Sequence, residues 1–294
     1  MKAFAYGFVE RTLEKLEKAL EKLEFKFSLK KPQSLRVMSY QLEFKPFESL
    51  EEALYFYKIR LKEFTRYVPK VIVFPRYTVN LLMGLVPFSH RRLLTSKGFV
   101  IIDKYFDLFK EAYRRILMIF GKHTDSLVIG GTLFSEKEEL LFIYKDGTVT
   151  VSKIKTPCLI ELEGTKFAFV KPEKLLTYST TRELQEAGIR VIFTSESFGN
   201  FDEWKMRLGI WARSQSIGIF GVNSVMVGKI LGETHEGVAF VSAPAFLTRN
   251  LDGFIVKLVD PKGRGIAIAD IDIETLENYL ANLPKTYRKY RSLV

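Results

Sequence analysis

Residues 35–78 decide the fold, with "LRVMSYQLEF" at 35–44, "SLEEALYFYKIRLKEFTRY" at 49–67 and "VIVFPRYT" at 71–78. The first segment predicts a strand. The second predicts a helix that Ser49 can cap, with Glu52 three residues later. The third opens with four apolar residues, typical of a strand buried on both faces. Strand, helix, strand in this order indicates an α/β protein. Arg76 follows the end of that strand, where ligands bind in open α/β sheets.

The same alternation continues to the end of the chain. We expect helices over 103–121, 179–187, 202–216 and 274–283, and strands over 126–134, 139–145, 148–155, 158–162, 166–171, 190–195, 217–225 and 265–273. Asp146-Gly147 predicts a two-residue hairpin turn. We therefore expect one α/β domain over residues 34–285. Before it lies a helical extension and linker (1–33, with a helix over 9–25), and after it a basic tail (286–294).

The composition excludes several classes of protein. Hydrophobic residues make up 47% of the 294 residues, enough for a large core, and no apolar run reaches the roughly 20 residues that span a bilayer. The single cysteine, Cys158, excludes an internal disulfide, and the three histidines lie far apart in sequence, so we expect no metal and no cofactor. The amino terminus lacks the features of a signal peptide, which predicts a cytoplasmic protein.

The net charge of +11 suits binding to nucleic acid or another anionic surface, yet the charge is spread along the chain. The densest cluster, "KTYRKYR" at 285–291, leaves nucleic-acid binding as an alternative. We expect a solvated basic surface instead, without a nucleic-acid or membrane partner. Abundant Lys and Glu with one Cys is typical of a heat-adapted (thermophilic) organism.

Six segments in this order resemble the nitrilase, or carbon-nitrogen hydrolase, superfamily. They are "RVMSYQLEFKPFESLEEAL", "VIVFPRY", "IYKDGTVTVSKIK", "TKFAFVKP", "RLGIWARSQSIGIFGVNSV" and "LVDPKGRGIAIADIDIETL". The resemblance covers about residues 35–285. It implies a four-layer α-β-β-α sandwich, usually paired through helices into a homodimer.

The resemblance also implies a Glu-Lys-Cys triad that cleaves amides and nitriles. A thiolate attacks the carbon, a carboxylate moves the proton, and a lysine stabilises the oxyanion. On the matching positions this chain keeps one of the three residues. The glutamate position is Arg76, the lysine position is Lys155 and the cysteine position is Pro172. Proline has no nucleophile and arginine stays protonated, so we expect the family's reaction not to run by the family's route.

Arg76 and Lys155 would then be two cations at one place, which requires a counter-ion. One candidate is internal, an ion pair between Arg76 and Glu173. The other is external, a small carboxylate or phosphate held by Arg76. Tyr77, His235 and the segment 194–204, with Phe198, Phe201 and Trp204, would line the pocket, although core or dimer packing explains these aromatic residues equally well.

Two kinds of function remain open. The first is a non-catalytic binding, regulatory or structural protein (a pseudoenzyme). The second is an active hydrolase or acyltransferase with a rearranged centre, for example Ser179 with Lys155 as its base. Cys158 lies within a strand region, which favours a buried, inert thiol.

Overall fold

The computed structural model describes residues 2–23, 35–91, 94–154, 156–230 and 232–283. The chain forms two compact units, each built from separate stretches of sequence. The first unit comprises residues 1–32, 44–154 and 228–234, and the second comprises 33–43, 155–227 and 235–294.

The first unit contains four consecutive strands: β2 (Val71–Val73), β3 (Leu127–Phe134), β4 (Glu139–Lys145) and β5 (Thr148–Lys153). β2 pairs with β3 in parallel, and the other two pairings are antiparallel. The β4–β5 turn places Asp146 at φ 48° and Gly147 at φ 79°. Positive φ at both positions is what a type I′ turn needs, so the predicted hairpin is confirmed.

The first unit also contains long helices. α2 (Leu50–Tyr67) begins as expected, with the Ser49 hydroxyl accepting a hydrogen bond from the Glu52 N–H at 3.1 Å. α4 (Leu94–Lys122) starts nine residues before the predicted 103, and the shorter elements η1 (Val79–Leu85) and α3 (Phe88–Arg91) occupy the preceding loop.

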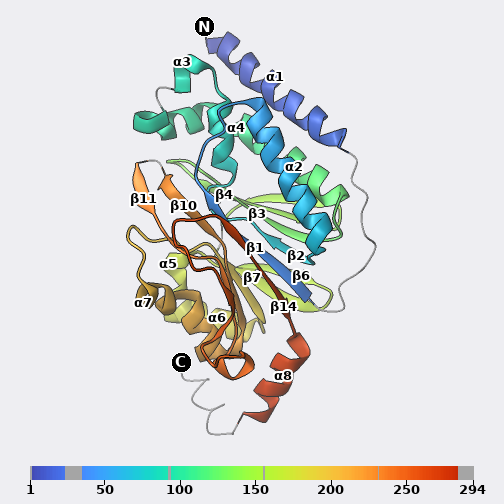
Figure 1. Ribbon diagram of the computed structural model, residues 1–294, viewed down its shortest axis with the longest axis vertical. Coiled ribbons are helices and arrows are strands. Elements are labelled where there is room, and N and C mark those ends of the chain that lie inside the picture. Colours follow the sequence, from blue (N-terminus) through green and yellow to red (C-terminus); the bar gives the residue numbers. More distant parts are fainter. Residues whose placement is uncertain (1, 24–34, 92–93, 155, 231, 284–294) are drawn as a thin grey trace. The chain divides into compact units, whose positions relative to one another are not determined.

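The N-terminal helix α1 (Lys2–Glu21) packs against α2 and α4, as Figure 1 shows. It buries Val9, Leu13, Leu16 and Leu20, and its Glu17 forms an ion pair with Arg115 of α4 at 3.1 Å. The leucine spacing therefore marks packing on the body of the chain. The helix begins before the predicted residue 9, and the expected linker falls on residues 24–34, outside the described part.

The second unit contains a six-stranded sheet in the order β13-β12-β9-β8-β7-β6. Its strands are β6 (Cys158–Leu162), β7 (Thr165–Phe169), β8 (Val191–Thr194), β9 (Phe220–Asn223), β12 (Phe240–Ser242) and β13 (Phe254–Lys257). β7, β8 and β9 run parallel, so their carboxyl ends share one edge.

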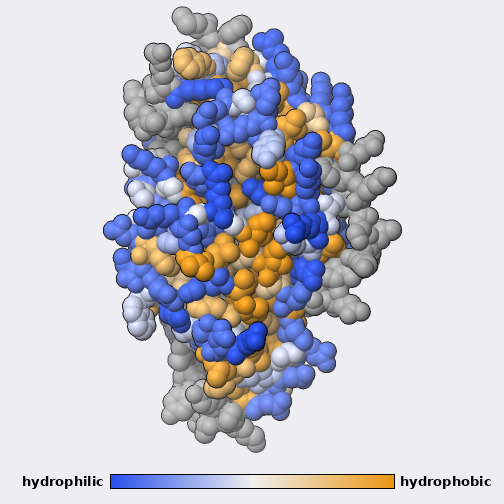
Figure 2. Space-filling view, in the orientation of Figure 1, coloured by the Kyte–Doolittle hydropathy of each residue, from blue (hydrophilic) through white to orange (hydrophobic). Residues whose placement is uncertain are grey.

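A further layer of strands belongs to the second unit. β1 (Leu35–Glu43) pairs in parallel with the start of β10 (Val225–Ile230) and antiparallel with β14 (Gly265–Ile271). Ser39 on β1 donates to the Asn223 carbonyl at 2.8 Å, and Gln41 accepts from the Ala239 N–H at 2.9 Å. These buried hydrogen bonds join the two layers. Hydrophobic side chains also gather on the surface where β14 lies (Figure 2).

The expected single strand at 217–225 is instead two strands, β9 and β10, that meet at Ser224. The Ser224 N–H donates to the Thr194 carbonyl at 3.0 Å, which fixes the point where the chain passes from one layer to the other. Such a crossing between buried layers keeps the same apolar composition on both sides, so the sequence could not mark it.

The helices of the second unit are α5 (Pro172–Leu175), α6 (Tyr178–Glu186), α7 (Glu203–Met206), η2 (Arg207–Trp211), η3 (Ser214–Gly218), η4 (Ala245–Leu247) and α8 (Ile273–Asn282). The expected continuous helix over 202–216 is wrong in one respect. Gly209, at φ −81° and ψ −124°, interrupts it. A Cβ at this position would lie 1.7 Å from Oε1 of Glu196, so the buried carboxyl occupies the space beside the interruption.

Within the described ranges, no helix has both the length and the apolar character that crossing a membrane requires.

Candidate functional site

The candidate site is the turn that follows β2 in the first unit. Phe74 continues the pairing of β2, donating its N–H to the Ile129 carbonyl at 2.8 Å. The chain then turns sharply, because Tyr77 adopts φ 68°, a left-handed conformation that is strained for a tyrosine. The Tyr77 N–H donates to Oγ1 of Thr132 at 3.2 Å, and the Thr78 hydroxyl donates to the Pro75 carbonyl at 2.7 Å.

A bulge in β3 makes room for this turn. The pairing of β3 with β4 shifts register between Ile129 and Thr132, and Gly131 within the bulge has φ 78°. A Cβ on Gly131 would lie 2.3 Å from the Pro75 carbonyl oxygen. The absence of a side chain there lets the two backbones approach closely and sets where Arg76 begins.

Arg76 makes a two-pronged ion pair with Glu139, the first residue of β4. Nε lies 2.6 Å from Oε1 and Nη2 lies 2.8 Å from Oε2. The Glu139 side chain is only 4% exposed and that of Arg76 is 23% exposed, so both charges are largely removed from water. Parallel hydrogen bonds of this kind fix orientation as well as supplying energy.

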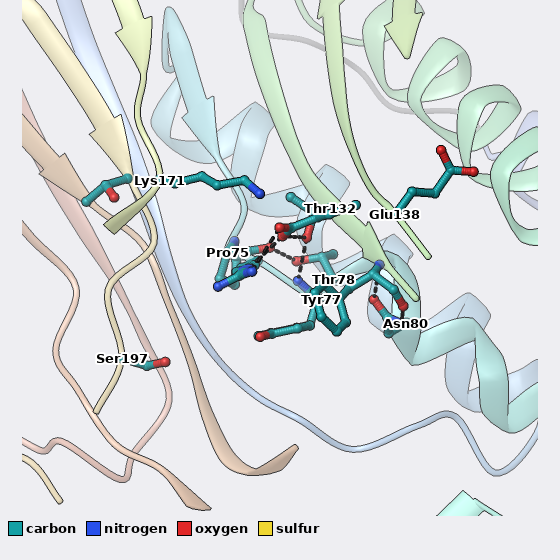
Figure 3. Close-up of polar contacts among 12 residues, drawn as sticks. Pro75, Tyr77, Thr78, Asn80, Thr132, Glu138, Lys171 and Ser197 are labelled. Carbon is teal, nitrogen blue, oxygen red and sulfur yellow. Dashed lines mark hydrogen bonds and ion pairs between the residues drawn. The ribbon is translucent and has the colours of Figure 1, made fainter. Parts of the chain in front are cut away.

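The surroundings hold this pair in place. The Thr132 hydroxyl donates to Oε1 of Glu139 at 3.0 Å, so the same threonine contacts both the turn and the carboxylate. The Arg76 guanidinium lies 5.1 Å from the Tyr77 ring centre and 5.4 Å from that of Phe134, within cation–π range. Figure 3 shows Pro75, Tyr77, Thr78 and Thr132 converging at this point.

Phe134 is itself fixed by Asn80. The Asn80 amide donates to the Phe134 carbonyl at 2.8 Å and accepts from its N–H at 3.0 Å. Together these contacts define the Arg76 cluster: Arg76, Tyr77, Asn80, Thr132, Phe134 and Glu139.

Chemically, the Arg76 cluster presents a guanidinium whose charge is balanced by an adjacent carboxylate. A guanidinium cannot accept a proton, so Arg76 cannot serve as a general base. Glu139 is a carboxylate, but the donors that engage both of its oxygens, from Arg76 and Thr132, stabilise its charged form. The cluster therefore stabilises the charged forms of both Arg76 and Glu139, and it does not favour proton transfer.

The counter-ion that the structure gives Arg76 is Glu139, which the sequence reasoning did not consider. The partner proposed from the sequence, Glu173, is exposed in α5 of the second unit, and its pairing with Arg76 stays a prediction. Lys155, the expected lysine of the triad, lies outside the described residues.

Pro172 is the first residue of α5, three residues after β7 ends at Phe169. A proline fits the first turn of a helix because its missing N–H would have no partner there. The structure therefore places Pro172 at a strand-to-helix turn, the kind of position that presents a nucleophile in other enzymes, but its ring carries no reactive group.

The aromatic residues expected to line a pocket behave differently from one another. Phe198 packs with Phe201 against the core of the second unit, which supports the packing explanation. Trp204 is 76% exposed on α7. Tyr77 is half-buried, with its ring centre 5.4 Å from that of Phe134, edge to face.

Cys158 is half-buried at the start of β6, and burial raises the pKa of its thiol. A raised pKa leaves less thiolate, which is the reactive form, so this cysteine is not activated. Within the described ranges, no group of three or more His, Cys, Asp or Glu side chains could hold a metal ion.

Solved structures share the fold of this chain. Neither a protein-family model nor a curated protein matches the sequence. Among solved structures, a mutant of the Nesterenkonia AN1 amidase from the nitrilase superfamily is similar at a TM-score of 0.58 and 13% identity, over 88% of this chain and 98% of that one. Saccharomyces cerevisiae Nit3, from branch 10 of the superfamily, is similar at 0.60 and 15% identity, over 89% and 98%.

The chain thus has the fold of the nitrilase superfamily, and the expected α-β-β-α sandwich class is confirmed. At these identities the likeness concerns the fold alone.

Proposed function

We propose that this nitrilase-fold protein does not cleave carbon-nitrogen bonds by a Glu-Lys-Cys route, and that the positions of that triad serve a non-catalytic binding, regulatory or structural role. The observation that carries the proposal is the ion pair of Arg76 with Glu139, at 2.6 and 2.8 Å. At the position where the resemblance places a proton acceptor, the chain holds a permanently charged donor that is already engaged.

Pro172 supports the same conclusion from the second unit. Thioester formation needs a thiolate, and a proline ring offers neither sulfur nor oxygen. The one cysteine of the chain, Cys158, has a raised pKa and lies within the β6–β7 pairing opposite Phe169. Neither position supplies the nucleophile that the family's chemistry requires.

The experiment is a turnover assay on purified protein with simple amides, carbamoyl compounds and nitriles, followed by intact-mass analysis. We expect no product and no acyl adduct, and the Lys155→Ala variant should not differ from the native protein. Turnover that disappears in Lys155→Ala would overturn the proposal in favour of a rearranged catalytic centre.

The Arg76 cluster also bears on the small-anion hypothesis. Because Nε and Nη2 of Arg76 already bind Glu139, the arginine's charge is balanced, and an added carboxylate or phosphate would gain less there than at a guanidinium without a carboxylate partner. We infer a structural ion pair. In a melting screen with small carboxylates and phosphate, we expect no stabilisation that depends on Arg76. Stabilisation that is lost in Arg76→Met would support a ligand site instead.

We further propose that the protein assembles as a homodimer through the helical side of its second unit. Leu176, Tyr178, Trp204 and Leu208 are each more than half exposed although apolar, and α5 and η2 are in contact. Large exposed apolar side chains mark association surfaces when they lie together. Light scattering coupled to size exclusion should give a dimer mass that falls to a monomer mass in Trp204→Glu, and a monomeric native protein would refute the proposal.

A further inference from the structure

A serine and a histidine of the second unit are in hydrogen-bond contact, and neither stands at a position that the resemblance assigns to the triad. Ser197 lies three residues beyond the carboxyl end of β8, and His235 ends β11 (Glu233–His235). Oγ of Ser197 is 2.8 Å from Nδ1 of His235. Both side chains are half-buried, so each is within reach of solvent.

The location favours a ligand site. β8 runs parallel to both β7 and β9, and the segment carrying Ser197 leaves the sheet at the carboxyl edge that these strands share. In α/β sheets this edge is where substrates bind. Ser197 is labelled in Figure 3, on the loop that follows the strand.

The backbone on both sides of Ser197 is fixed. On one side, the Asn223 side chain accepts from the Glu196 N–H at 2.8 Å and also donates to the Val238 carbonyl at 3.1 Å. On the other side, Phe198 and Glu236 exchange two backbone hydrogen bonds of 2.7 Å each.

His235 is held by the same bridge, because Glu236 follows it directly. The Glu236 carboxylate accepts from the Phe201 N–H at 2.9 Å and pairs with Lys262 at 3.0 Å. The serine and the histidine are therefore positioned by contacts that their chain neighbours make. Preorganisation of this kind is what a catalytic pair requires.

We propose that Ser197 and His235 form a nucleophile–base pair that accepts acyl groups from carboxylic esters. The pair is recognised by its geometry, a hydroxyl within hydrogen-bond reach of an imidazole nitrogen. The proposal is separate from the proposed function, which concerns carbon-nitrogen bonds and positions 76 and 172.

His235 carries the proton in both halves of the proposed reaction. In the tautomer with its proton on Nε2, Nδ1 of His235 takes the hydroxyl proton as Oγ of Ser197 bonds to the ester carbonyl carbon. The carbon–oxygen bond to the leaving group then breaks, and His235 returns the proton to the departing alcohol oxygen. Water, deprotonated by the same nitrogen, releases the acid and restores the serine.

The test uses the full-length protein and a fluorophosphonate probe, which bonds to an activated serine oxygen with loss of fluoride. We expect one adduct by intact mass, mapped to Ser197 by peptide analysis. p-Nitrophenyl acetate should be hydrolysed with the same dependence on Ser197. Absence of an adduct on native Ser197 overturns the proposal without any variant being needed.

Variants separate a catalytic pair from a hydrogen bond that only fastens the loop. Ser197→Ala should abolish the adduct, and Ser89→Ala, which alters an exposed serine of α3 in the first unit, should leave it unchanged. His235→Gln should slow labelling about 100-fold, with partial rescue by added imidazole, because a positioned base contributes about that factor. Labelling of folded His235→Gln at the native rate would refute the role of the histidine.

Discussion

The stability of the second unit should depend on pH through Glu196, because the carboxyl group of this residue is buried. Only 5% of the residue is exposed, and its carboxyl lies against the interruption at Gly209, where Oε2 accepts a long hydrogen bond of 3.4 Å from the Ile210 N–H. Burial raises the pKa of Glu196 to about 8, against the weaker opposing effect of the Ile210 N–H. The group is therefore neutral in the folded protein at pH 7.

The sign of the effect follows from proton binding. Between the ordinary pKa of 4.5 and about 8, folded Glu196 keeps a proton that the unfolded chain has lost. Stability must then fall as the pH rises through this window, by at most about 1.4 kcal/mol per pH unit, and level off above it. Across the whole window the loss amounts to about 5 kcal/mol.

The assay is urea unfolding of native protein and of Glu196→Gln at intervals between about pH 5 and about pH 9. The uncharged amide removes the titration, so the stability of the variant relative to native protein should rise with pH by up to about 5 kcal/mol. Leu159→Ala, which alters an exposed residue of β6 that carries no ionisable group, is the control and should differ from native protein by a constant amount. A constant difference for Glu196→Gln as well would refute the reasoning.

Three further predictions concern the first unit. Glu139→Gln should lower the free energy of unfolding by about 3 kcal/mol, because it leaves the Arg76 charge without its buried partner. The double variant Arg76→Met/Glu139→Leu should lower the free energy of unfolding by less than Glu139→Gln does. An equal or greater loss of stability in the double variant would contradict the pairing. Gly131→Ala should cost more than about 2 kcal/mol in chemical unfolding, because its φ is 78° and the new methyl would meet the Pro75 carbonyl; a neutral result would show that the bulge can relax. Leu16→Ala, in the buried stripe of α1, should cost about 2–5 kcal/mol, and an unchanged melting curve would mean that α1 does not pack on the body.

Local signals in the sequence predicted the elements that depend on neighbouring residues. Ser49 caps α2 and Asp146-Gly147 turns the hairpin, each at the predicted position. These features are set by residues a few positions apart, where turn and cap chemistry is specific. The alternation of strands and helices then sufficed for the fold class.

The counter-ion of Arg76 could not be predicted in the same way. Glu139 lies 63 residues further along the chain, and it reaches Arg76 because β2 pairs with β3 and β3 with β4. The bulge at Gly131 shifts that register, so counting from the strands would have misplaced the carboxylate. Glu173 seemed the natural partner only because it follows Pro172 in the aligned motif.

The prediction of a continuous helix over 202–216 was wrong for a related reason. Glycine inside a helical pattern weakens the helix but does not forbid it, so Gly209 alone did not predict an interruption. What decides the outcome is Glu196, thirteen residues earlier on another element, whose carboxyl fills the space that a side chain on Gly209 would take. Such long-range steric exclusion leaves no local trace in the sequence.

The turn after β2 shows which residue the geometry of the site depends on. A non-glycine residue with positive φ, such as Tyr77, costs about 1–3 kcal/mol and persists only where its surroundings fix it. Here the Tyr77 N–H binds Thr132, the Thr132 hydroxyl binds Glu139, and Glu139 binds Arg76. The carboxylate contacts both the guanidinium and the threonine that accepts the Tyr77 N–H. The strained turn and the orientation of the arginine are therefore coupled through the buried charge at residue 139.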